Sequence, residues 1–89
     1  MARVDDEITL TRYHLGIEAV AIGQAMLDSD YEEARFRAHL LHSQACDLAI
    51  DEVADAARDV LHHLPMGGPP KTGIGRAMLR LSSAVDTVR

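Results

Sequence analysis

The residues that break regular structure are gathered at one place in this chain, and their position limits the fold more than any other feature. The stretch "PMGGPPKTGIG" at 65–75 holds all three prolines and four of the six glycines. Elsewhere apolar residues recur at steps of three and four, and the alternation typical of strands is missing. The pattern predicts an all-α chain with helices over about 6–27, 31–46, 51–64 and 73–88.

The length predicts the architecture. A chain of 89 residues holds one small domain, so we expect 1–89 to form a single helical bundle. Four helices joined by short connections most simply form an up-down antiparallel four-helix bundle. A core of this size is marginal, which keeps self-association open as a source of stability.

Composition and charge exclude several classes of function. A formal net charge of −5 is unlike the basic face of a protein that follows nucleic acid phosphates. The single cysteine cannot form an intramolecular disulfide, which suits a reducing cytoplasm. No apolar run approaches the roughly 20 residues of a membrane span, and no signal-peptide pattern is present. We therefore expect a cytoplasmic protein with no membrane or nucleic acid partner.

The three later helices each have one apolar stripe, which we expect to face the core. Asp28, Ser29 and Asp30 offer caps for the second helix, Asp51 for the third and Thr72 for the fourth. The predicted core residues of these helices are Ala34, Ala38, Leu41, Ala45, Leu48, Val53, Ala56, Ala57, Val60, Leu61, Leu64, Ile74, Ala77, Met78, Leu81, Val85 and Val88.

The first helix differs because it has two apolar faces. The simpler interpretation is a helix packed centrally within its own bundle, and the alternative is a homodimer contact through this helix. One face holds Ile8, Leu15, Ala19, Ile22 and Met26, and the other holds Leu10, Ile17 and Ala21.

The stretch "AHLLHSQACDLA" at 38–49 holds the candidate site. At about 100° per residue His39 lies opposite the apolar stripe, with Arg35 one turn before it, His42 one turn after it, and Ser43 beside it. A neutral imidazole has a nitrogen lone pair that can attack phosphorus, and phosphoryl transfer requires access and nearby positive charge. These residues suit a phosphoryl-accepting histidine at position 39, but the pattern is non-specific because exposed histidines are common on protein surfaces.

The chain resembles the histidine-containing phosphotransfer (HPt) domains over residues 28–64. The matching residues are Asp30, then Ala38-His39-Leu40-Leu41-His42-Ser43-Gln44-Ala45, Leu48-Ala49-Ile50 and Val53-Ala54-Asp55-Ala56-Ala57. The resemblance implies a four-helix bundle that carries a phosphoryl group on His39 to or from the aspartate of a response-regulator receiver domain, or from a histidine kinase. It implies a carrier without an ATP site or cofactor of its own, since magnesium enters with the receiver.

Three residues depart from the family pattern. His42 stands where the family usually has lysine, and a free histidine is mostly neutral at pH 7 whereas lysine is charged. Ser43 replaces a glycine, and Ala49 replaces the glycine of the turn between the second and third helices. These departures leave open a degenerate domain that binds a receiver or another partner without transfer, with Phe36, Leu40 and Met26 as docking candidates.

A metal site is the competing chemistry. His39, His42 and Cys46 share a helical face and are ligand types that zinc or copper accepts, but a tetrahedral site needs a fourth ligand. The sequence offers only His62 and His63 at the far end of the third helix, where a structural role is the simpler interpretation. His14 and Glu18 are expected to form a surface pair.

Overall fold

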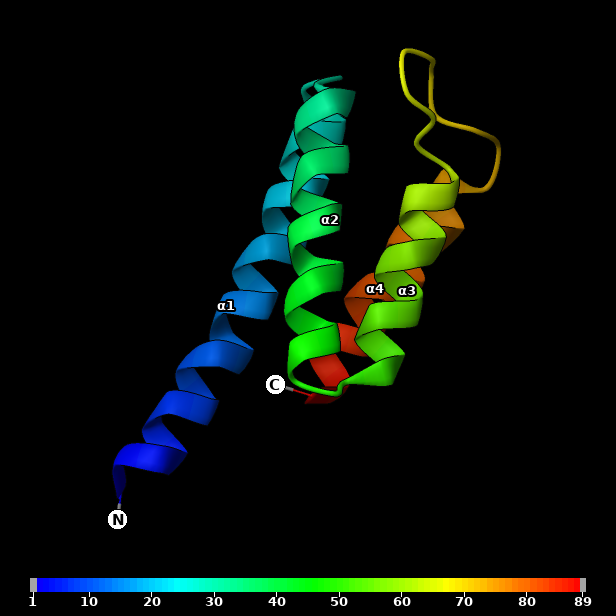
Figure 1. The fold of residues 1–89 in the computed structure, drawn as a ribbon. Coiled ribbons are helices and arrows are strands. Elements are labelled where there is room, and N and C mark those ends of the chain that lie inside the picture. Colours follow the sequence, from blue (N-terminus) through cyan, green and yellow to red (C-terminus); the bar gives the residue numbers. More distant parts are fainter. Residues whose placement is uncertain (1, 89) are drawn as a thin grey trace.

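The computed structural model describes the backbone of residues 2–88 and the side chains of residues 13–88. It contains four helices, α1 (Ala2–Leu27), α2 (Tyr31–Asp47), α3 (Asp51–His62) and α4 (Ile74–Val88), and residues 2–88 hold no strand (Figure 1). The predicted all-α class is confirmed. The bounds differ from the predicted ones by at most four residues. Within the described part of the chain, no helix combines the length and apolarity that crossing a membrane requires.

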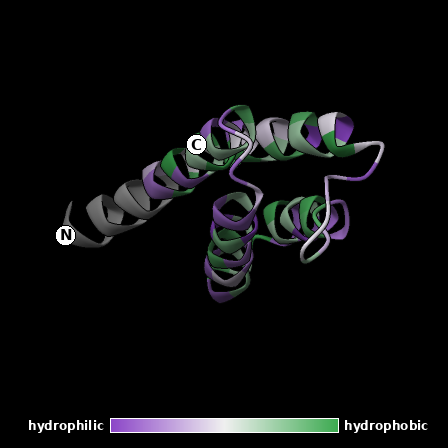
Figure 2. Ribbon diagram, turned by 90° about the horizontal axis from the view of Figure 1, so that it is seen from above, coloured by the Kyte–Doolittle hydropathy of each residue, from purple (hydrophilic) through white to green (hydrophobic). Residues whose placement is uncertain are grey.

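The four helices pack in a ring. Contacts join α1 to α2, α2 to α3, α3 to α4 and α4 back to α1, with none between the diagonal pairs in the described part. The α1–α2 turn and the α3–α4 loop lie at the top of Figure 1, and the α2–α3 turn lies at the bottom. Hydrophobic and hydrophilic residues alternate in bands along the helices in Figure 2, as expected when one face of each helix is buried.

The turn from α1 to α2 caps the C-terminal end of α1 and the N-terminal end of α2. Ser29 adopts the left-handed conformation with φ 58°, and its N–H donates to the Met26 carbonyl at 3.1 Å. The Asp30 N–H donates to the Ala25 carbonyl at 2.8 Å, which completes a Schellman-type end. The Asp30 carboxylate then accepts from the Glu33 N–H at 3.3 Å. The predicted cap of α2 is therefore confirmed at Asp30.

The turn from α2 to α3 repeats this geometry without a side-chain cap. Ala49 has φ 56°, its N–H donates to the Cys46 carbonyl at 3.1 Å, and the Ile50 N–H donates to the Ala45 carbonyl at 2.9 Å. Ile50 occupies the N-cap position of α3, so the predicted cap at Asp51 is wrong. Asp51 is instead the first helical residue, where its charge opposes the positive end of the helix dipole.

The core lies on the inner faces of the helices and consists largely of small and branched aliphatic side chains. Its largest fully buried members are Leu15, Ile22, Leu41, Leu81, Val53 and Val60. In α2 the predicted stripe is confirmed at Ala34, Ala38, Leu41 and Ala45. Leu48 is 41% exposed, so its assignment to the core is wrong. Helix α2 ends at Asp47, so Leu48 lies just beyond the part of the helix whose period places the stripe in the interior.

Helix α1 buries only one of its two apolar faces. Leu15 and Ile22 are fully buried, and Ala19 and Met26 pack against the core. On the other face Ile17 is 47% exposed, so the interpretation of α1 as a centrally packed helix is wrong. Two helices, α2 and α4, cover α1, and they reach only one side of it. The predicted contributions of Ile8 and Leu10 lie outside the described side chains.

An ion pair joins α1 to α2. The Arg37 guanidinium donates to the Glu18 carboxylate at 2.8 Å, and Arg37 Nε lies 3.2 Å from the carboxylate of Glu33 on its own helix. Glu18 thus pairs with a residue of α2, and the predicted surface pair between His14 and Glu18 is wrong.

The breaker-rich stretch forms the connection between α3 and α4. His63 ends α3, and its carbonyl accepts from the Lys71 N–H at 2.8 Å across the loop. The His63 ring Nδ1–H donates to the Asp59 carbonyl at 2.8 Å, since a carbonyl can only accept. Helix α4 begins after Gly73 (φ 101°), whose carbonyl accepts the first helical bond, so Gly73 takes the cap position predicted for Thr72.

Candidate functional site

His39 lies in the middle of α2, on the side opposite the core. Ala38 and Leu41 are fully buried, and the helical period turns His39 outward, where it is exposed. The His39 side chain forms no hydrogen bond or ion pair with any described residue. Both ring nitrogens are therefore open to an approaching group.

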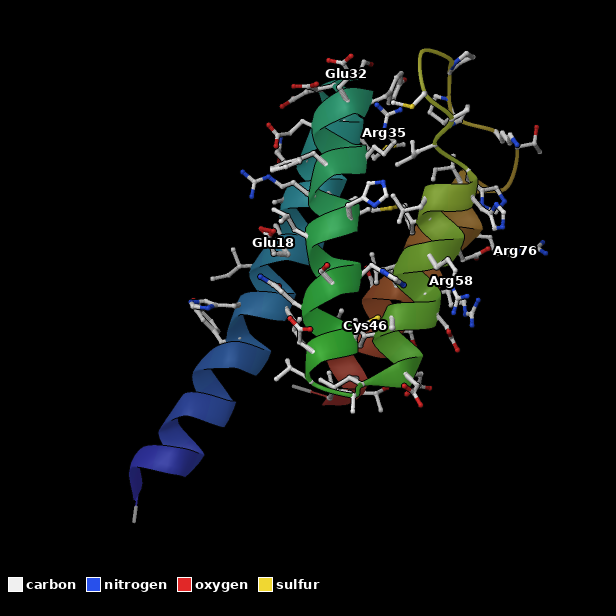
Figure 3. All side chains as sticks on the ribbon, viewed as in Figure 1. Glu18, Glu32, Arg35, Cys46, Arg58 and Arg76 are labelled. Atoms are coloured by element: carbon white, nitrogen blue, oxygen red, sulfur yellow. The ribbon has the colours of Figure 1, made fainter. Side chains whose placement is uncertain are left out.

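Arg35 and His42 stand one helical turn before and after His39, and both are half-buried. Arg35 also lines a groove between the start of α2 and the α3–α4 loop, which Pro65 and Gly68 line from the side of the loop. Figure 3 shows Arg35 on the side of α2 that looks toward this loop. The two candidate cations therefore lie on the flank of His39 that is nearer α3 and the loop.

Two arginines lie one turn or less from His39, and their surroundings differ. Arg37 is engaged by Glu18 and Glu33, so its charge is neutralised between α1 and α2. Arg35 forms no ion pair with any described residue. Arg35 is thus the guanidinium that remains available to an anion at His39. The i, i+4 spacing of Glu33 and Arg37 is visible in the sequence. The pairing of Arg37 with Glu18 is not, because Glu18 lies on another helix.

His42 has a neighbour on the same helix. Its Nε2 lies 3.8 Å from Sγ of Cys46, which is exposed, a weak hydrogen bond between a thiol and a ring nitrogen. Figure 3 shows Cys46 near the C-terminal end of α2. The other ring nitrogen, Nδ1, is not part of this contact.

The metal-binding alternative gains no geometric support. Among side chains 13–88, no group of three or more His, Cys, Asp or Glu residues is placed to hold a metal ion. His39, His42 and Cys46 follow one another along a single helix, and His62 lies at the end of α3. Of these ligand types only His42 and Cys46 lie close together, and no third described ligand joins them.

The opposite flank of His39 is apolar and open. Phe36 is 58% exposed, Leu40 is 37% exposed, and Ser43 is exposed beside them. Met26, the third docking candidate, is half-buried against the core and contributes less to this surface. A partner that reached His39 would meet an apolar edge on one side and the two candidate cations on the other.

Comparisons of the chain with protein-family models, with curated proteins and with solved structures give no match. The function must therefore be argued from the chemistry of the site itself.

Proposed function

We propose that this protein is a histidine phosphotransfer carrier of two-component signalling, built as an up-down antiparallel four-helix bundle and working in the cytoplasm. The observation that carries the proposal is the exposed imidazole of His39 on the outer face of α2, with no partner among the described residues and with Arg35 and His42 one turn away on either side. The donor or acceptor is the aspartate of a response-regulator receiver domain, and a histidine kinase is the other source.

The transfer step needs little from the carrier. A ring nitrogen of neutral His39 uses its lone pair to attack the phosphorus of an aspartyl phosphate, while the other ring nitrogen keeps its proton. The N–P bond forms as the P–O bond to the aspartate breaks, and that bonding pair stays on the aspartate carboxylate. In the reverse direction the carboxylate attacks phosphorus, and the lone pair returns to the ring. The partner supplies magnesium.

The residues around His39 have separate roles in this proposal. Arg35 offers guanidinium N–H groups to the phosphoryl oxygens, which carry the negative charge of the transferring group. Protonated His42 supplies a second positive charge from the following turn. Ser43 is small and exposed, so it leaves room for the active site of the partner.

The docking surface of the proposed carrier is the apolar flank of the site. Phe36 and Leu40 project on the side of His39 that lies away from Arg35 and His42. Their exposure supplies the apolar contact area that a transient complex requires at its centre. A receiver docked there would bring its aspartate over His39.

The experiment is labelling of the purified protein with a radioactive phosphoryl group from a phosphorylated receiver or a histidine kinase. Wild type and His14→Gln should become labelled, since His14 is an exposed histidine on another helix. His39→Gln should not become labelled. The label on wild type should be lost in acid, because the N–P bond of phosphohistidine is acid-labile. Equal labelling of wild type and His39→Gln would refute the proposal.

A second candidate is a receiver-binding module without transfer. It is favoured by the contact between His42 and Cys46, which leaves the position of the usual lysine occupied by a side chain that is already hydrogen-bonded. In that case the protein binds a receiver and takes up no label, and His39→Gln binds as tightly as wild type.

A further inference from the structure

Helix α1 exposes a row of four large apolar side chains, interrupted once by a glutamine, on the face that no other helix covers. Tyr13 is 59% exposed, Ile17 47%, Val20 69% and Leu27 81%. Gln24 is exposed and lies between Val20 and Leu27 in this row. The five positions are therefore spaced by four, three, four and three residues. We call these five residues the outer stripe of α1. Spacing of this kind is typical of a helix that pairs with another helix along its length.

We propose that the outer stripe of α1 binds the outer stripe of a second copy of this chain, with the two helices antiparallel. In an antiparallel pair, Ile17 of each copy lies opposite Val20 of the other, and Tyr13 lies opposite Gln24. The apolar residues then meet at the centre of the contact, on both sides of the two-fold axis. The Tyr13 hydroxyl is placed to bond the Gln24 amide of the other copy. The part of the stripe from Tyr13 to Gln24 is therefore complementary to itself, as a two-fold contact requires, and Leu27 lies beyond this pairing.

The charges of α1 agree with a second copy as the occupant. Between Tyr13 and Leu27 the only residue with a carboxylate or a permanent positive charge is Glu18, which turns toward α2 and pairs with Arg37 there. Two chains that each carry a net charge of −5 repel one another over most of their surface. The outer stripe is a surface along which they can approach without bringing like charges together.

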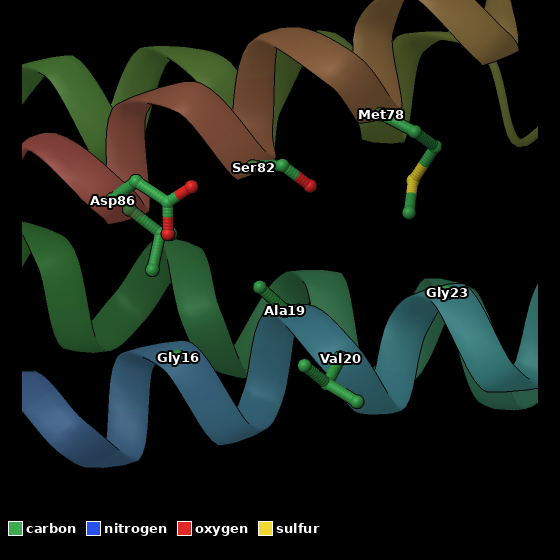
Figure 4. Close-up of a pocket in the computed structure, with 8 residues that line it drawn as sticks. Gly16, Ala19, Val20, Gly23, Met78, Ser82 and Asp86 are labelled. Carbon is green, nitrogen blue, oxygen red and sulfur yellow. The ribbon is translucent and has the colours of Figure 1, made fainter.

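Gly23, beside the stripe, leaves room for a second helix, whereas Gly16 is buried. Gly16 and Gly23 are seven residues apart and line the groove between α1 and α4 with Val20, Met78 and other side chains (Figure 4). A Cβ built at Gly23 would meet no atom within 4 Å, so nothing in this chain requires glycine there. Because glycine is unfavourable in a helix interior, its presence is better explained by the close approach of another helix.

The size of the contact sets its strength. The stripe spans 15 residues, about 21 Å at 1.5 Å per residue, so the contact is smaller than that of a permanent dimer. We expect reversible association, visible when the protein concentration is raised from the micromolar to the millimolar range. The contact is separate from the site on α2, so His39→Gln should associate like wild type.

The first experiment is analytical ultracentrifugation of the full chain over this concentration range. Wild type should pass from monomer to dimer, and Val20→Glu should weaken the association by at least about tenfold because it buries a charge at the centre of the contact. Met66→Glu is the matched control, since Met66 is 84% exposed in the α3–α4 loop and should not affect association. Circular dichroism should show that both variants keep the helical content of wild type. A monomer at every concentration, or association that survives Val20→Glu, would overturn the proposal.

A substitution at Gly23 should change the stability of the monomer and the strength of association in opposite directions. Gly23→Ala should raise the resistance of the monomer to urea, because alanine is the better helix former and the space beside it is empty. The same variant should weaken the dimer, since the added methyl group lies where the second helix approaches. A variant that is more stable and associates as strongly as wild type would contradict the role of Gly23.

Disulfide trapping tests the orientation. In a Cys46→Ser background, chains with Val20→Cys should form a disulfide-linked dimer, because the two copies of residue 20 lie three residues apart along the paired helices. Chains with Leu27→Cys should not, because the two copies of residue 27 lie about 25 Å apart along the axis in the antiparallel pair. Equal trapping at both positions would mean a parallel pair and overturn the proposed orientation.

Discussion

The guanidinium of Arg37 on α2 lies 2.8 Å from the carboxylate of Glu18 on α1, and this ion pair is the one described link of its kind between the two helices. The Glu18 side chain is only 12% exposed and that of Arg37 is 37% exposed, so water screens the pair less than a fully exposed one. Glu33 adds a second carboxylate at 3.2 Å. The pair lies where α1 packs against α2, and the outer stripe of α1 is on the face that no helix covers.

Arg37→Met should lower the free energy of unfolding by about 1 kcal/mol, because it removes the ion pair and leaves the Glu18 carboxylate without its partner. Urea unfolding at low salt measures the loss, which should shrink at high salt. Arg58→Met is the matched control, since Arg58 pairs with Asp55 on its own helix and both side chains are more than half exposed. A similar loss in both variants would contradict a special contribution from the link between α1 and α2.

Ala49→Gly should stabilise the protein by about 1 kcal/mol. Ala49 holds φ 56°, a conformation that costs an alanine energy and a glycine almost none, and its N–H bond to Cys46 is kept in the variant. Differential scanning calorimetry should show a higher melting temperature. Ser82→Gly, at an exposed position within α4, should have the opposite effect. A lower melting temperature for Ala49→Gly would contradict the left-handed conformation of residue 49.

Leu41→Ala and Leu48→Ala should differ strongly, although both residues belong to the predicted apolar stripe of α2. Leu41 is fully buried, so its truncation should leave a cavity and cost about 3 kcal/mol. Leu48 is 41% exposed, so its truncation should lower the free energy of unfolding by less than about 1 kcal/mol. Chemical denaturation of the two variants gives both values, and equal losses would place Leu48 in the core after all.

If the protein is a phosphocarrier, His42→Lys should make transfer less dependent on pH. Raising the pH from about 6 to about 8 removes the charge of an ordinary histidine and leaves that of lysine, so the advantage of the variant should grow over this range. The measurement is the ratio of the two transfer rates at each pH. The ratio removes effects of pH that the two proteins share. A ratio that stays constant with pH would exclude His42 as a source of charge in the transfer step.

The helical class, the positions of the four helices and most of the core could be read from the sequence. A residue such as Leu41 is buried because it shares a helical face with Ala34, Ala38 and Ala45, and that periodicity is a local property of the chain. The outward position of His39 follows from the same period. Asp30 could be predicted as a cap because its acceptor atoms lie close in sequence to the N–H group that they bond.

The remaining features depend on contacts between distant residues. The sequence shows two apolar faces on α1, but only the packing of α2 and α4 decided that Leu15 is buried and Val20 is exposed, because a local pattern does not say how many neighbours a helix will have. Several helices carry positively charged residues that could pair with Glu18. Because α2 packs beside α1, Glu18 pairs with Arg37, and Arg35 stays available beside His39. Burial and charge pairing are set by which surfaces meet in space, and sequence spacing carries that information only within a single helix.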